Sequence, residues 1–183
     1  MTLMKVFKII IIFFCSQLFA KADQNNLDQL FQKLKNESDQ NLAYRIEDQI
    51  WKQWTTHKND DGLTELMSYG TVLMNNQDYD SAKKIFTKII KKDPNWAEGW
   101  NKRATVYYYQ KEYELSQADI DKVIELEERH FGALSGQGMV QIKLDNLEKA
   151  LKSYKKVLEI YPSNRSAQTL VDEIEKIIKE ETI

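Results

Sequence analysis

The sequence has few of the residues that mark β-rich, disulfide-rich or disordered proteins. Its 183 residues contain one cysteine, two prolines and six glycines. So little proline and glycine disfavours a sheet protein with many tight turns, and it leaves no Gly/Ser/Pro-rich linker. A lone cysteine cannot form a disulfide within the chain. With 30% charged residues, the composition favours one compact all-α domain or one short array of helical repeats.

Basic clusters and metal-binding patterns are also missing. The formal net charge is −2 and no block of Lys and Arg is present, which argues against nucleic acid or an anionic membrane as a partner. The only histidines, His57 and His130, match no zinc-ligand spacing. We expect both to be surface or loop residues, with no metal and no cofactor. Ser135 lacks the flanking glycines of a nucleophile elbow. The sequence therefore predicts no catalytic site and no small-molecule substrate.

The first 22 residues differ from the rest of the chain. Lys5 and Lys8 precede a short apolar run, and Ala20-Lys21-Ala22 follows it. This order is typical of a secretory signal peptide, and the apolar run is short for a membrane span. Removal of residues 1–22 would take away Cys15 and change the formal charge from −2 to −5. We expect an exported, periplasmic protein, and the alternative is an uncleaved anchor that contacts the membrane only through this segment.

A 34-residue self-similarity runs through the middle of the chain. Three units, 63–96, 97–130 and 131–164, follow one another without insertion or deletion. Small residues recur at two positions of each unit, and a large apolar residue recurs at a third. In chain order these positions are Gly70, Ala104 and Gly138; Ala82, Ser116 and Ala150; and Phe86, Ile120 and Tyr154. Such a period is the signature of a repeat architecture.

Each unit reads as a pair of helices. Apolar residues fall at i, i+3, i+4 and i+7, which is helical spacing. The pattern breaks at 75–78, 110–112 and 145–146 and so predicts a turn between two helices. The small residues allow the two helices to cross closely, and stacked pairs bury a continuous core. Most aromatic residues of the units are expected in this core.

These features resemble the tetratricopeptide repeat (TPR) family. Pro94 and Pro162 stand two periods apart at unit ends, and Trp100 matches the tryptophan of that family's pattern. The resemblance covers 102 of the 183 residues. It implies an all-α TPR solenoid of antiparallel helix pairs.

Helical segments flank the three units. Residues 27–58 match the repeat poorly and are expected to form a degenerate helical hairpin that covers the first full unit through Trp51 and Trp54. Residues 165–183 form a charged amphipathic segment, and we expect a C-terminal capping helix.

The resemblance also implies a concave groove, lined by the first helix of each unit, that binds protein or peptide partners. The alternative is that the N-terminal hairpin or the capping helix fills this groove. Gly132 and Gly136 have no repeat role and would let a peptide backbone come close. Carried over by repeat position, the expected groove residues are Met67, Thr71, Met74, Asn101, Thr105, Tyr108, Tyr109, Gly132, Ser135, Met139 and Ile142.

A carboxylate clamp, the TPR arrangement of Lys and Asn that grips an acidic chain end, is not present. Met67, Thr71, Asn101 and Thr105 do not supply its residues. We therefore expect a non-catalytic exported protein that mediates protein–protein interactions in a scaffold or assembly role. The alternatives are a self-associating structural protein and an enzyme with an unrecognised site.

Overall fold

The computed structural model describes residues 26–181, and the expected export signal at 1–22 lies outside this range. The described residues form helices and no strand, which confirms the all-α prediction. No described helix is long and apolar enough to cross a membrane. After a helix over residues 26–36 come α2 (Gln40–Thr55), α3 (Asp61–Asn75), α4 (Tyr79–Lys92), α5 (Ala97–Tyr109), α6 (Tyr113–Leu126), α7 (Phe131–Lys143), α8 (Leu147–Ile160) and α9 (Arg165–Glu181).

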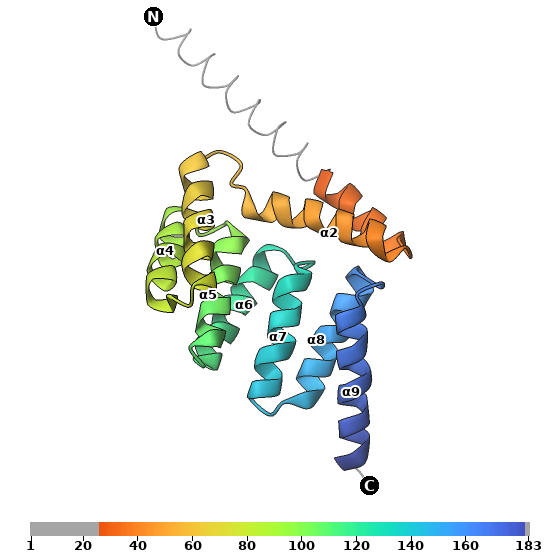
Figure 1. Cartoon of the computed structure of the whole chain (residues 1–183). Helices are drawn as coiled ribbons and strands as arrows, with labels where there is room; N and C mark the ends of the chain where they lie inside the picture. Colours follow the sequence, from red (N-terminus) through yellow and green to blue (C-terminus); the bar gives the residue numbers. More distant parts are fainter. Residues whose placement is uncertain (1–25, 182–183) are drawn as a thin grey trace, which may run out of the picture.

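The three repeat units are the helix pairs α3–α4, α5–α6 and α7–α8, stacked side by side into a solenoid (Figure 1). The predicted small residues lie where the helices of a pair cross. A Cβ atom at Gly70 would stand 2.7 Å from the Phe86 ring, and one at Gly138 would stand 2.5 Å from the Tyr154 ring. Larger residues would force the helices apart, because interiors of this density do not absorb extra volume.

The turns inside the units share one strained position. Gln77, Lys111 and Asp145 have φ values of 63°, 62° and 59°, and they stand 34 residues apart. This left-handed conformation favours glycine and is unfavourable for other residues, least so for Asp and Asn. The repeat therefore imposes its turn geometry even where the local residue opposes it.

The N-terminal hairpin does not cover the first unit, so that expectation was wrong. We call residues 26–55, the first helix and α2, the N-terminal strap. Figure 1 shows α2 extending from the start of α3 towards the start of α9. Trp54 and Trp51 contact Phe131 of the third unit, with ring centroids 5.0 and 5.6 Å apart. The strap, the third unit and α9 share one apolar core.

Hydrogen bonds hold the strap at both ends. At one end, the Gln40 side chain donates to the Ser163 carbonyl at 3.1 Å. At the other, the backbone N–H of His57, just beyond the strap, donates to Thr64 Oγ1 at 2.9 Å. An ion pair of 2.7 Å between Asp28 and Arg129 joins the first helix to the loop before α7. The strap therefore spans from the first unit to the last.

Candidate functional site

A pocket of about 170 Å³ lies on the first helices of the second and third units. It brings together seven of the eleven residues expected in the groove. The remaining lining comes from Ala104, Ser116, Ile120 and Gly136. The seven expected residues are Asn101, Thr105, Tyr108 and Tyr109 of α5 and Gly132, Ser135 and Met139 of α7.

No charged side chain lines this pocket. Tyr109 and Met139 are 53% and 41% exposed and form its rim. The Tyr109 ring stacks on Tyr79 with centroids 5.4 Å apart, and Tyr108 lies edge-on to Tyr109 at 6.0 Å. Burial raises the pKa of Tyr108, with smaller contributions from Tyr113 and Tyr109, so its hydroxyl is neutral. The pocket can receive an uncharged, largely apolar group, because aromatic and methionine side chains give large and adaptable contacts.

The other four expected residues do not line this pocket. Met67 is 2% exposed and belongs to the core of the first unit, which corrects its assignment to the groove surface. Met74 packs on that same core and Ile142 on the core of the third unit. The Thr71 hydroxyl donates to the Met67 carbonyl at 2.8 Å. The apolar periodicity of α3 serves core and groove positions alike, so the sequence did not distinguish them.

The two glycines without a repeat role differ in their surroundings. A Cβ atom at Gly132 would stand 2.5 Å from the Trp51 ring, so the chain's own strap takes up this space. At Gly136 the nearest such contact is Ile120 Cδ1 at 3.6 Å, an ordinary distance. The alternative of a self-covered groove therefore holds at the start of α7 and not further along it.

A second pocket, of about 270 Å³, adjoins the first. Ser135 and Met139 line both pockets. Its other walls come from α2, the end of α8 and the first turn of α9. The concave face thus carries two neighbouring hollows rather than one.

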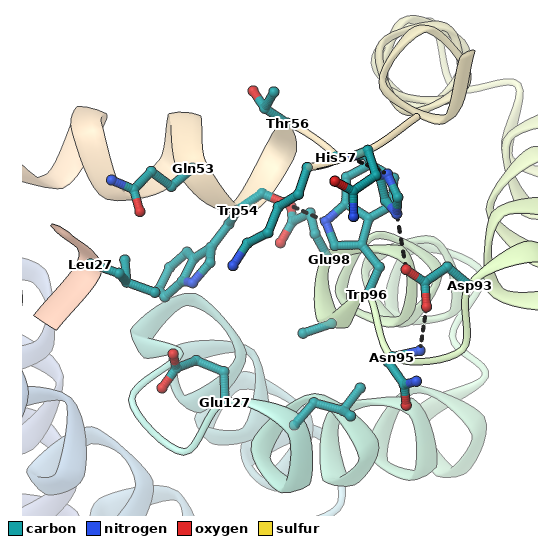
Figure 2. A pocket seen from close by; sticks show the side chains of 14 residues that line it. Leu27, Gln53, Trp54, Thr56, His57, Asp93, Asn95, Trp96, Glu98 and Glu127 are labelled. Carbon is teal, nitrogen blue, oxygen red and sulfur yellow. Dashed lines mark hydrogen bonds and ion pairs between the residues drawn. The ribbon is translucent and has the colours of Figure 1, made fainter. Parts of the chain in front are cut away.

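A third pocket, of about 310 Å³, lies where the end of α2 meets the loops between the units. Figure 2 shows the hydrogen bonds that join these loops. His57 Nε2 and Asp93 Oδ2 are 2.9 Å apart, the Asn95 N–H donates to Asp93 Oδ1 at 2.9 Å, and the Trp96 indole donates to the Trp54 carbonyl at 2.8 Å. These contacts join the strap to the units and explain the pocket as a structural junction.

His130 was expected at the surface or in a loop and is instead fully buried at the start of α7. Its Nδ1 accepts the Ala133 N–H at 3.0 Å, and its Nε2 lies 3.1 Å from Glu98 Oε2. An acceptor Nδ1 leaves Nε2 to carry the proton and donate to the carboxylate. The Trp54 ring stacks on His130 with centroids 3.9 Å apart. His130 therefore caps α7 and anchors the strap.

Glu98 is the buried charge of this cluster, with 1% exposure. Burial alone would raise its pKa, but the hydrogen bond and charge of His130, the charge of Lys102 and the Asn101 amide together place the pKa below its ordinary value. Lys102 Nζ lies 3.3 Å from Glu98 Oε1. The sequence showed Glu98 as a groove position, and no local signal indicated its pairing with a histidine 32 residues away.

Comparisons with known proteins agree on the repeat. Family models of the tetratricopeptide repeat match residues 66–95, 97–130 and 131–164. A TPR repeat-containing protein of Rhizobium etli is 34% identical over 156 residues, which cover 84% of this chain and 74% of that protein. RNA polymerase II-associated protein 3 of Mus musculus is 28% identical over 148 residues, and the match covers 73% of this chain and 22% of that protein.

A solved structure gives the same fold. The first TPR of Spaghetti (RPAP3) bound to the HSP90 peptide SRMEEVD superposes with a TM-score of 0.63 at 26% sequence identity. The superposition covers 67% of this chain and 98% of that one. The part left over includes helices that the compared domain does not have.

Proposed function

Because this chain belongs to the tetratricopeptide repeat family, we propose that it is a non-catalytic interaction module that holds a segment of a partner protein in its concave groove. The observation that carries this proposal is the uncharged pocket between α5 and α7, with its exposed tyrosine and methionine. A similar TPR domain holds a peptide. An exposed apolar hollow on a soluble face is favourable only where a partner covers it.

The partner segment is uncharged at the groove. The peptide SRMEEVD bound by the similar domain carries two glutamates and an aspartate, which call for cations in the receiving groove. Lys102 is engaged with Glu98, and no Lys or Arg lines the first pocket. We therefore assign this groove to an apolar segment and not to an acidic chain end.

The test is partner capture by two variants. Tyr108→Ala with Met139→Ala removes the walls of the pocket, and Tyr69→Ala, 55% exposed on α3 outside it, is the matched control. The groove variant should lose captured proteins that wild type and control retain, as measured by quantitative mass spectrometry, while all three keep the same melting temperature. Equal capture by the groove variant would contradict the proposal.

Self-association is the second candidate, because the outer side of α3 exposes Tyr69 and Val72. In the later units the place equivalent to Val72 packs on a preceding unit, so a second copy could dock there. Sedimentation velocity over a hundredfold concentration range separates the two candidates. A monomer throughout would remove self-association.

We also propose that the chain acts outside the cytoplasm, in a scaffold or assembly role. The support is the basic start, apolar run and Ala20-Lys21-Ala22 of residues 1–22. Intact-mass measurement of the exported chain should give a protein that begins at Asp23. A chain that retains Met1 in the cytoplasm would contradict this proposal.

A further inference from the structure

The second pocket continues the groove past Ser135 and Met139. Because these two residues line both pockets, one segment lying along the concave face would meet the two pockets in succession. Tyr154 and Tyr161 line the second pocket from the end of the third unit, and Glu47 lines it from the strap. Arg165 lines it from the first turn of α9.

Two tyrosine hydroxyl groups of this pocket have no hydrogen-bond partner. Tyr154 and Tyr161 are 1% and 0% exposed, and neither hydroxyl oxygen bonds to any described group. Buried polar groups without partners are rare because they destabilise the fold. The repeat does not need the Tyr154 hydroxyl, since Phe86 and Ile120 fill the equivalent places and carry none.

Both hydroxyls are neutral donors at ordinary pH. Burial raises the pKa of Tyr154 to about 12, with a smaller contribution from Tyr108. Burial, and then the neighbouring Glu47 carboxylate, raise the pKa of Tyr161. One oxygen of Glu47 accepts the Trp51 indole N–H at 3.2 Å, which leaves the second oxygen to receive a donor. The pocket therefore offers two hydroxyl donors and one carboxylate acceptor.

The charges of the walls narrow the class of ligand. A carboxylate in this pocket would face Glu47, and an ammonium group would face Arg165 and the positive end of α9. A primary carboxamide meets neither penalty. Its oxygen accepts hydrogen bonds and its nitrogen donates two, which matches the hydroxyls on one wall and the carboxylate on another.

We propose that the second pocket binds the side-chain carboxamide of an asparagine or glutamine in the partner segment, next to the apolar residue held in the first pocket. The amide oxygen accepts from Tyr154 and Tyr161, and the amide nitrogen donates to Glu47. Met139, which is unbranched and 41% exposed, rotates to uncover the hydroxyls. This inference rests on the proposed groove function and names the chemistry that the groove selects.

The probe is a phage-displayed library of random dodecapeptides, selected on the immobilised full chain. Peptides selected on wild type should carry Asn or Gln at a fixed offset from an apolar residue. Selection on Tyr154→Phe/Tyr161→Phe should keep the apolar preference and lose the amide. A selected peptide should bind this variant about tenfold more weakly, as expected for two neutral hydrogen bonds, and replacing its Gln by Glu or Leu should weaken binding to wild type by a similar factor.

The control variant is Tyr69→Phe, which removes an exposed hydroxyl outside both pockets and should leave the selection unchanged. The Tyr154→Phe/Tyr161→Phe chain should melt at the wild-type temperature or slightly above it, because it loses hydroxyls that have no partner. This result separates a binding effect from a folding effect.

The outcomes distinguish the inference from the function on which it rests. Apolar enrichment that is the same with and without the two hydroxyls would overturn the carboxamide site and leave the groove in place. Enrichment of Asp or Glu in place of Asn or Gln would also overturn it. No enrichment on wild type over Tyr108→Ala/Met139→Ala would remove the groove function itself.

Discussion

The two ends of the array differ in what covers their first helices, and three equivalent valines show it. Val72 in α3, Val106 in α5 and Val140 in α7 stand 34 residues apart. Val106 and Val140 are 0% exposed because a preceding unit packs on them, whereas Val72 is 54% exposed. The strap that could have covered α3 instead packs on the third unit and α9. The array is therefore open at its first unit and closed at its third.

The difference teaches that a repeat does not decide where its flanking helices pack. A helix hairpin before the first unit could have continued the stack. Here Gly132 leaves room for Trp51 at the start of α7, and His130 offers a flat partner for Trp54. The third unit thus presents a site for the strap that the first unit does not.

The largest expected effect is at the closed end. Trp54→Ala removes a side chain that is 7% exposed and packs on Phe31, His130 and Phe131. It should lower the free energy of unfolding by about 3–5 kcal/mol. Urea denaturation measures this, with the exposed Tyr69→Ala of the open end as control, expected within about 0.5 kcal/mol. Similar losses for both variants would refute the open and closed assignment.

Glu98→Gln should have the next largest effect, and this effect should depend on pH. At neutral pH the loss of a buried, paired carboxylate should lower the free energy of unfolding by about 3 kcal/mol. The pKa of Glu98 lies below its ordinary 4.5 in the folded state. Its contribution is therefore present above 4.5 and is lost as pH falls through the lower folded pKa. Denaturation at pH 7 and pH 3 should show the gap between wild type and variant closing in acid.

The valine series tests the comparison directly. Val106→Ala and Val140→Ala should each lower the free energy of unfolding by about 2 kcal/mol, because each leaves a cavity between two units. Val72→Ala should change it by no more than about 0.5 kcal/mol. A loss at Val72 equal to the other two would mean that something covers α3 in solution, and sedimentation would then identify a second copy.

A pair of glycines sharpens the closed end. Gly132→Ala places a Cβ atom against the Trp51 ring and should lower the free energy of unfolding by about 1–2 kcal/mol. Gly136→Ala has ordinary room beside Ile120 and should raise it by up to about 1 kcal/mol, because alanine favours the helix. The same sign for both would show that the strap does not rest on Gly132.

The smallest effect belongs to the turns, which are alike in all units. Lys111→Gly relieves a non-glycine residue at φ 62° and should raise the free energy of unfolding by about 0.5–1 kcal/mol. Asp145→Gly should gain less, since aspartate tolerates this conformation better. Thermal melts of the two variants measure the order.

The repeat and its helix pairs were predictable because their signals are local and recur three times. Gly70, Ala82 and Phe86 have counterparts in every unit, so each position is supported by the others. The uncharged pocket was predictable for the same reason, since seven of its residues follow from repeat position.

The destination of the strap was not predictable, because it depends on contacts between residues far apart in the chain. Gly132 was a trace of it, as a glycine inside a helix without a repeat role. Nothing in the sequence linked that missing side chain to Trp51. His130 was misjudged for the same reason, since its partners Glu98 and Trp54 lie in other units of the chain.

The strap has a consequence for how the chain folds. In a simple solenoid each unit contacts only its neighbours, so folding can begin anywhere and spread. Here the bond between Gln40 and Ser163 and the ion pair between Asp28 and Arg129 close loops of 123 and 101 residues. Such long loops slow folding and tie the ends of the array together. The chain is therefore expected to fold and unfold as one cooperative unit, with its last step the docking of its first residues.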